Sequence, residues 1–248
     1  MNEQTRIVMG MPVTVAFVQD GAKDLIEAVF GWFDQVDRRF SLYRSDSEIS
    51  RFNSGQIPEG ALSAEMRDVL AMAEQTRQES QGFFDVARPS GGCDPTGIVK
   101  GWAIKKAALL LAKKGVQNYC INAGGDIQSA GVNFDGELWR LGISSPFRSG
   151  EIIKVLTPHG AGVATSGSYV RGQHIWNPHA PAEKLSDIAS ITVIGPDILE
   201  ADRFATAAFA MGKDGVYFIE GMPGLEAYQI DVSGMATQTS AFERYVIS

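Results

Sequence analysis

Short β-rich runs, bounded by turn residues, follow one another from about residue 117 to residue 195 without a predicted helix between them. Parallel strands need a crossover of roughly a dozen residues or more, whereas antiparallel strands can be joined by tight turns. Consecutive short runs therefore favour antiparallel pairing. Strands are expected in this region over residues 117–121, 126–131, 138–144, 151–157, 161–165 and 189–195.

Segments with helical periodicity flank this strand-rich region. Their apolar residues recur at three- and four-residue spacing, which is typical of a helix with one buried face. Ser63 is a suitable N-cap for the second of them, and Gly115 and Gly212 can end the third and the fourth in a left-handed conformation. The helices are expected over 22–37, 64–80, 100–114 and 199–211, and final strands over 216–219, 225–230 and 242–247.

The N-terminal β-rich run, residues 7–18, is interrupted by Gly10 and Pro12, which indicates a bulge or an edge position near a ligand. Between Gly82 and Lys100, glycines and prolines exclude regular structure for most of the segment. The chain contains no internal repeat, low-complexity tract or long linker. The sequence therefore predicts one α+β domain over residues 1–248, with mostly antiparallel sheets and packed helices.

Composition and charge narrow the classes of function. Hydrophobic residues make up 44% of the chain and charged residues 21%, as in soluble globular proteins. The net charge of −7 argues against a positively charged surface that binds nucleic acid or anionic lipid. No stretch approaches the length of about 18 apolar residues that a membrane-spanning helix needs. Two cysteines, without zinc-site spacing, argue against a disulfide scaffold and a zinc centre. We expect a cytoplasmic protein without nucleic-acid or membrane partners.

The first candidate site is the segment DPTGIVKGWA, in which Asp94, Gly97 and Lys100 lie at the start of a predicted helix. Backbone N–H groups at a helix N-terminus bind anions, glycine permits close approach, and lysine adds a positive charge. An Asp-Pro turn that caps the helix, with Lys100 in solvent, explains the same residues equally well. The spacing excludes the nucleotide-binding pattern GxxxxGK[ST].

The second candidate lies in EADRFATAAFAMG, where Asp202 and Thr206 are four residues apart on a predicted helix and share one face. A carboxylate and a hydroxyl are hard oxygen ligands that suit Mg²⁺, with waters and phosphate oxygens completing the shell. In the alternative interpretation, Asp202 stabilises the helix dipole and Thr206 bonds to the backbone of its own helix.

Two further segments also have a structural explanation. In CINAGGDIQSAG, Asn122 and Asp126 bracket a Gly-Gly pair between two β-rich runs, which local rules interpret as a hairpin turn. In VATSGSYVRGQHIWNP, His174 is followed by Ile175 and Trp176, so its imidazole can be partly sheltered and suited to acid–base catalysis. A histidine with a purely structural role fits the same pattern. The GxSxG elbow of serine hydrolases is absent.

Taken together, the chain resembles the ApbE family, the FAD:protein FMN transferases. The matching segments, in order, are VMGMPVTV, FSLYRSDSEISRFN, DPTGIVKGWAIKKAALLLAKKGVQNYCINAGGDI, VATSGSYVRGQHIWNP and SITVIGPDILEADRFATAAFAMG. They extend from Met9 to Gly212. The resemblance implies a T-fold-related α+β protein. It also implies a Mg²⁺-dependent enzyme that cleaves the pyrophosphate of FAD and attaches FMN, through a phosphoester, to a Ser or Thr hydroxyl of an acceptor protein.

The resemblance also implies which residues contact the cofactor. Met9, in the Met-Gly motif, and Tyr43, in the Ser-x-Tyr segment, match contacts to the flavin. Asp94 and Lys100 match the family's Asp and Lys before the KG helix, with Lys100 facing the nucleotide. Trp176 occupies a nearby cofactor-contact position.

The resemblance likewise implies which residues bind the metal and which residue transfers a proton. Gly97 matches a position whose main-chain carbonyl binds the metal. Asp202, Ala205 and Thr206 match the metal-binding AD-xxx-T motif. His174 matches the histidine that acts as acid or base near the scissile phosphate. These roles come from the resemblance and not from the spacing of the residues alone.

Three features depart from the family pattern. The segment HIWNPHAP has Asn177 where the family has Asp and lacks the following Thr-Gly, the loop between Phe84 and Asp94 is short, and Lys105 replaces an acidic residue. Some relatives let water attack instead of an acceptor hydroxyl, which releases FMN and AMP. The sequence therefore leaves three functions open, namely an FMN transferase, an FAD pyrophosphatase and a protein that binds FAD without turnover.

Overall fold

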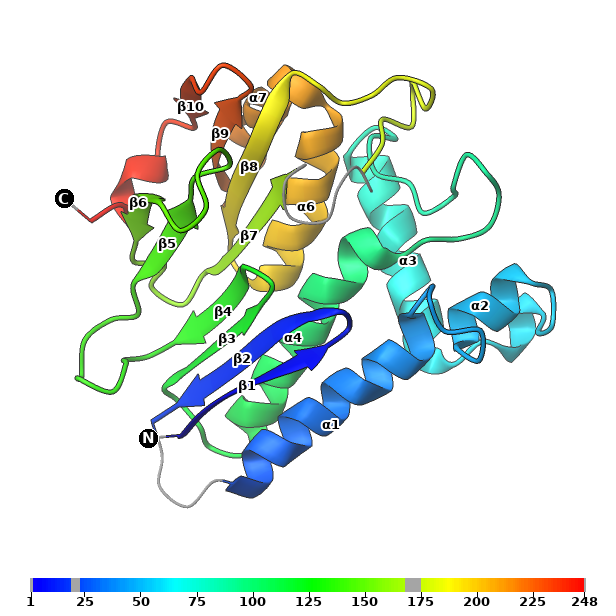
Figure 1. Ribbon diagram of the computed structural model, residues 1–248, viewed down its shortest axis with the longest axis horizontal. Coiled ribbons are helices and arrows are strands. Elements are labelled where there is room, and N and C mark those ends of the chain that lie inside the picture. Colours follow the sequence, from blue (N-terminus) through cyan, green and yellow to red (C-terminus); the bar gives the residue numbers. More distant parts are fainter. Residues whose placement is uncertain (1, 19–22, 168–174, 248) are drawn as a thin grey trace.

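A computed structural model describes residues 2–18, 23–167 and 175–247. Its main element is an eight-stranded sheet in the order β1-β2-β3-β4-β7-β8-β9-β10, and each neighbouring pair of strands is antiparallel (Figure 1). A separate hairpin pairs β5 with β6. The strands are β1 (Asn2–Val8), β2 (Met11–Phe17), β3 (Tyr119–Ala123), β4 (Asp126–Ala130), β5 (Leu141–Ser144), β6 (Ile152–Leu156), β7 (Gly162–Gly167), β8 (Ile188–Gly195), β9 (Glu226–Asp231) and β10 (Ala236–Gln238). The predicted α+β class with mostly antiparallel pairing is confirmed.

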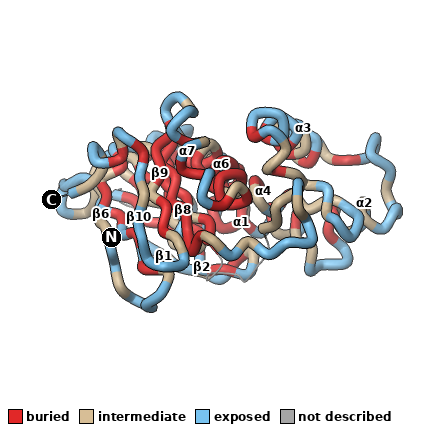
Figure 2. Tube along the Cα trace, turned by 90° about the horizontal axis from the view of Figure 1, so that it is seen from above, coloured by how far each residue is buried: buried red, intermediate tan, exposed pale blue. Residues whose placement is uncertain are grey.

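Helices cover one face of this sheet, and Figure 2 shows buried residues concentrated where α6 and α7 lie over β8 and β9. Within the three described ranges, no helix combines the length and apolarity that a bilayer crossing requires. The α-helices are α1 (Lys23–Phe40), α2 (Glu48–Asn53), α3 (Ala64–Glu79), α4 (Thr96–Lys113), α6 (Ile198–Ala210) and α7 (Gly215–Glu220). Short 3-10 helices are η1 (Glu59–Ala61), η2 (Gly212–Asp214) and η3 (Phe242–Tyr245).

Local chemistry sets several helix ends as the sequence predicts. The Ser63 hydroxyl accepts the Met66 N–H at the start of α3, and Ser47 does the same for Ser50 at the start of α2. Gly115, with φ 81°, follows α4. Gly212, with φ 63°, follows α6. Both glycines adopt the left-handed conformation that ends a helix without a Cβ clash.

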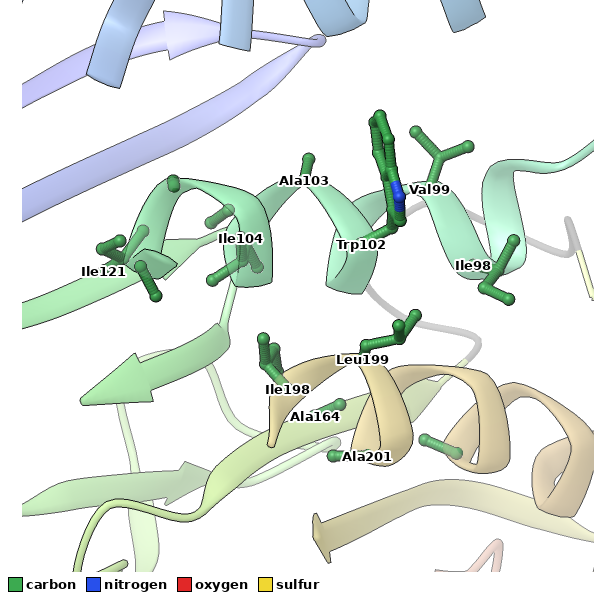
Figure 3. Close-up of a cluster of buried hydrophobic side chains, with 14 of the residues drawn as sticks. Ile98, Val99, Trp102, Ala103, Ile104, Ile121, Ala164, Ile198, Leu199 and Ala201 are labelled. Carbon is green, nitrogen blue, oxygen red and sulfur yellow. The ribbon is translucent and has the colours of Figure 1, made fainter. Parts of the chain in front are cut away.

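The main hydrophobic core lies between the sheet and the helix pair α4 and α6. Trp102 and Ile104 of α4 are buried, and Ile198 and Leu199 of α6 point toward α4 (Figure 3). The opposite face of the sheet carries a smaller core, because side chains alternate between faces along a strand. That core contains Ile127, Val163 and Ile194 from the sheet, Leu141, Ile143 and Leu156 from the β5–β6 hairpin, and Phe242.

Two glycines one turn apart allow α6 to approach α4 closely. A Cβ atom on Gly101 would lie 2.6 Å from Asp202 Cβ and 2.8 Å from the Ile198 carbonyl oxygen. A Cβ atom on Gly97 would lie 3.0 Å from Thr206 Cγ2. Real Cβ atoms do not tolerate contacts with backbone as short as that at Gly101, so the helix spacing requires glycine there.

The structure differs from the sequence-based prediction at both ends of the chain. Residues 7–18 are not one interrupted strand, because Met9 and Gly10, with φ 54° and 72°, form the turn of the β1–β2 hairpin. The expected strand 216–219 is helix α7, and the expected strand 242–247 contains the 3-10 helix η3. The segment GVYFIE favours a strand locally, but packing on α6 and β9 buries Val216 and Ile219 at helical spacing. Strand β10 was not expected.

We predict that Gly101→Ala lowers the free energy of unfolding by about 1–3 kcal/mol, because the added methyl forces α4 and α6 apart. Gly31→Ala, in the middle of α1, is the matched control, since a Cβ there meets nothing within 4 Å. That substitution should be neutral or stabilise by about 0.5–1 kcal/mol. Urea unfolding of both variants measures the difference. Equal stabilities would contradict the close packing of the two helices.

Candidate functional site

A large cavity opens beside the N-terminal half of α4. Its volume is about 510 Å³, which is within the usual range of ligand pockets. Its walls come from three places in the sequence: the β1–β2 turn with Met9, the end of α1 and the segment after it with Tyr43, and the first turns of α4 with Thr96 and Lys100. The cavity therefore brings together Met9, Tyr43 and Lys100, which the sequence analysis had assigned to the cofactor.

Two features of this cavity indicate a ligand-facing surface. Met9 has a φ of 54°, in the left-handed region that a non-glycine side chain seldom adopts. Tyr43 is 100% exposed. Its ring is amphipathic and large enough to cover an aromatic ligand. Strained backbone and exposed aromatic side chains both concentrate at binding sites.

A second, narrower cavity adjoins the first, since Thr96 and Lys100 line both. Its wall includes Gly97 on α4, Asp202 and Thr206 on α6, and part of β7 with Ser166. The N-terminus of α4, an 18-residue helix, therefore faces this space. A helix N-terminus carries a partial positive charge and directs N–H groups outward, which suits an anion.

A buried charge cluster lies beside the second cavity, whose lining includes Lys100 and Asp202. The Lys100 ammonium lies 2.6 Å from Asp126 Oδ2 and 3.8 Å from Asp202 Oδ1. Asp202 Oδ2 also accepts the Gly101 N–H at 2.6 Å. The side chains of Asp126 and Asp202 are 1% and 5% exposed. Two carboxylates thus share one ammonium in a dry environment.

The environment of Asp202 opposes its ionisation. Burial raises the pKa of the Asp202 carboxyl, and the negative charge of Asp126 raises this pKa further. The Lys100 ammonium and the Gly101 N–H lower the same pKa but do not compensate for burial. A cation bound beside this carboxyl group would favour its ionised form.

The oxygen donors around Asp202 fit Mg²⁺. The Thr206 hydroxyl lies one turn from Asp202 and donates to the Gly97 carbonyl oxygen at 3.1 Å, so the three groups converge from α4 and α6. Within the described part of the chain, no group of three or more His, Cys, Asp or Glu side chains could hold an ion by itself. Mg²⁺ is commonly held by one or two carboxylates with waters and substrate phosphates, which agrees with this donor set.

The remaining predicted residues lie in different places. Asp94 Oδ1 accepts the N–H and the hydroxyl of Thr96, at 3.0 and 2.6 Å, and so pairs with the first residue of α4. Asp94 and Trp176 line a small pocket that shares Gly97 and Thr206 with the narrow cavity. Ala205 is buried in α6 and is not part of the lining of these cavities. His174 lies outside the described residues.

Sequence reasoning assigned Asp126 only to a turn. The hairpin is indeed present, with Ala123 paired to Asp126 and with Gly124 and Gly125 at φ 60° and 99°. The structure adds that the Asp126 carboxylate contacts Lys100. The strand sequence DIQSA contains no local signal of this partner, because the burial of Asp126 follows from the packing of the strand in the folded protein.

We predict that Asp202→Asn stabilises the protein in EDTA at pH 8 by roughly 1–3 kcal/mol, because it removes a buried charge while the amide oxygen can still accept the Gly101 N–H. Since the pKa of Asp202 is higher in the folded protein than in the unfolded chain, stability falls as pH rises from the ordinary aspartate range. The gain should therefore be smaller at pH 5. Thermal unfolding measures it, with exposed Asp135→Asn as the control. A loss of stability at pH 8 would contradict the charge argument.

Comparison with known families gives a match over most of the chain. The model of the ApbE family matches residues 9–91 and 87–229. A protein of Vibrio cholerae serotype O1 named FAD:protein FMN transferase is 26% identical, with 97% of this chain and 89% of that protein covered. The two matched ranges include the large cavity and the charge cluster.

Solved structures have the same fold. The flavin transferase ApbE from Vibrio cholerae superposes with a TM-score of 0.85 at 24% identity, covering 98% of both chains. The apo form of the Pseudomonas stutzeri flavinyl transferase ApbE has a TM-score of 0.85 at 25% identity, covering 99% of this chain and 97% of that one.

Proposed function

The chain belongs to the ApbE family, and on this basis we propose that it is a Mg²⁺-dependent FAD:protein FMN transferase that acts as one domain. It cleaves FAD and transfers FMN to a Ser or Thr hydroxyl of an acceptor protein. The observation that carries this proposal is the convergence of Lys100, Asp202 and Thr206 in a narrow cavity that continues into one of about 510 Å³. FAD has two large ring systems joined by a diphosphate. The large cavity suits a ring system, and the narrow cavity suits the diphosphate.

We assign the diphosphate to the narrow cavity and a ring system to the large one. The N-terminus of α4 and the Lys100 ammonium supply positive potential for phosphate oxygens. Met9 and Tyr43 offer thioether and aromatic contacts to a planar ring. In each cavity, the charge or polarity of the lining residues therefore matches the part of FAD that is assigned to it.

The charge balance of the narrow cavity supports metal dependence. A bound cation requires ionised Asp202, and two ionised carboxylates and one ammonium would then carry a net charge of −1 there. A diphosphate carries further negative charge and would be repelled by this cluster. A divalent cation reverses the sign of the local field, so diphosphate binding and cation binding support each other.

The chain's own residues would hold the reactants in line. The Asp202 carboxylate, the Thr206 hydroxyl and the Gly97 carbonyl would hold the cation, and the Ala205 carbonyl is assigned to it by family resemblance alone. When bound, Mg²⁺ neutralises charge that develops on the phosphate oxygens. Lys100 orients the diphosphate, and His174 holds or transfers the proton of the attacking hydroxyl, which would contribute about 10²–10⁴-fold.

The segment around Asn177 keeps hydrolysis as a second candidate function. Asn177 Oδ1 accepts the His179 N–H at 2.9 Å, so the amide forms the local turn that an aspartate could also form. The change from the family's Asp therefore preserves the local fold but removes a negative charge beside Trp176. Loss of this charge can weaken acceptor binding while FAD cleavage continues, and the chain would then release FMN and AMP.

Incubation with FAD and Mg²⁺, with and without a candidate acceptor protein, tests the function. A fluorescent acceptor band on a denaturing gel, together with AMP, supports FMN transfer. AMP and free FMN without a labelled acceptor support hydrolysis. Bound FAD without any AMP would reject both enzymatic functions, and an EDTA control shows whether turnover needs a divalent ion.

We predict that Thr206→Val raises the Mg²⁺ concentration for half-maximal FAD cleavage by about 10–100-fold, because valine keeps the shape of threonine and lacks the oxygen ligand. Thr237→Val on β10 is the control and should leave the Mg²⁺ dependence unchanged. Metal titrations of initial rates measure the effect. An unaltered Mg²⁺ dependence of the Thr206 variant would remove this residue from the metal site.

A further inference from the structure

Asp126 has a more deeply buried side chain than Asp202, the other acid of the charge cluster. It opens β4 directly after the Gly124–Gly125 turn, and its side chain is 1% exposed. Its Oδ1 accepts the Thr165 N–H of β7 at 3.0 Å, and its Oδ2 lies 2.6 Å from the Lys100 ammonium. The sheet therefore fixes this carboxylate on one side, and the other side faces Lys100.

Lys100 depends on such a partner for its position. A lysine side chain has a flexible four-carbon stem, so the place of its charge is set by its contacts. Its other acidic neighbour, Asp202 Oδ1, is 3.8 Å away, beyond hydrogen-bond distance. Lys100 lines both cavities and its side chain is 18% exposed, so the ammonium lies at their boundary.

We propose that Asp126 is a positioning residue that holds the Lys100 ammonium at the boundary of the two cavities and away from Asp202. This inference rests on the proposed function of the same site. With Asp126 in place, Lys100 can contact a phosphate oxygen while Asp202 stays available to a cation. Without the Asp126 charge, Asp202 is the nearest acid, and the ammonium moves onto it and competes with the metal.

The inference has a first test that does not involve FAD. In protein labelled with ¹⁵N-lysine, the protons of an ammonium group held by a buried carboxylate exchange slowly with water, so the group gives a ¹H–¹⁵N signal. The signal that is missing from the spectrum of Lys100→Met is assigned to Lys100. This signal should vanish or shift strongly in Asp126→Asn. Asp197→Asn is the matched control, because Asp197 pairs with Lys105 on the same helix at 2.7 Å. A Lys100 signal that is unchanged in Asp126→Asn would overturn the inference.

The second test is a double-mutant cycle in FAD cleavage. Asp126→Asn should lower kcat by about 10–100-fold, the usual effect of losing a residue that orients an active-site group, and Asp197→Asn should not. In the Lys100→Met background, Asp126→Asn should change kcat by less than about twofold, because a residue that acts through Lys100 has no effect without it. A full additional loss in that background, or a single Asp126→Asn variant as active as the parent, would overturn the inference.

The two tests separate this inference from the proposed function. If the parent protein cleaves no FAD, the proposed function fails, while the ammonium signal still shows whether Asp126 positions Lys100. If the parent is active and the Asp126 variant is equally active, the function stands and the positioning role fails. Circular dichroism of Asp126→Asn and Asp126→Ala shows whether a loss of kcat reflects unfolding. If Asp126→Asn is unfolded, both tests are carried out with Asp126→Ala.

Discussion

The close packing of α4 on α6 is the constraint on which the site depends. Gly101 has no room for a side chain, because its Cα lies against Asp202 and the backbone of Ile198. This contact allows the Gly101 N–H to reach the Asp202 carboxylate and the Thr206 hydroxyl to reach the Gly97 carbonyl. The same two glycines therefore determine the helix spacing and the distance between the oxygen donors on the two helices.

The site also concentrates acidic groups in the buried interior of the fold. Asp126 on β4 and Asp202 on α6 are both buried, and the Lys100 ammonium lies within 4 Å of each carboxyl group. Burial of such a cluster costs stability, which a protein can tolerate because the surrounding core is large and well packed. The arrangement makes physical sense if a cation and a diphosphate complete the charge balance, which connects the structure with the proposed transfer chemistry.

Sequence patterns predicted those parts of the fold that depend on local interactions. The N-cap at Ser63 and the left-handed residue Gly115 follow from side-chain and backbone chemistry within a few residues, and both are present. The predominance of antiparallel pairing also followed, because many of the short expected strands have no predicted helix between them. Prediction was wrong for 216–219, where β-branched and aromatic residues favour a strand and contacts with α6 and β9 impose a helix.

The sequence by itself determined the class of fold and, through its family motifs, a set of polar residues suited to phosphate and metal chemistry. It could not decide between a solvated Lys100 and one paired with a buried carboxylate, or between a turn residue and an ion-pair partner at Asp126. Only the tertiary structure decided these, since Gly101 and Asp202 are separated by 101 positions along the chain and meet through helix packing. Contacts of that kind depend on the shapes of two whole surfaces, and no local pattern of residue types encodes them.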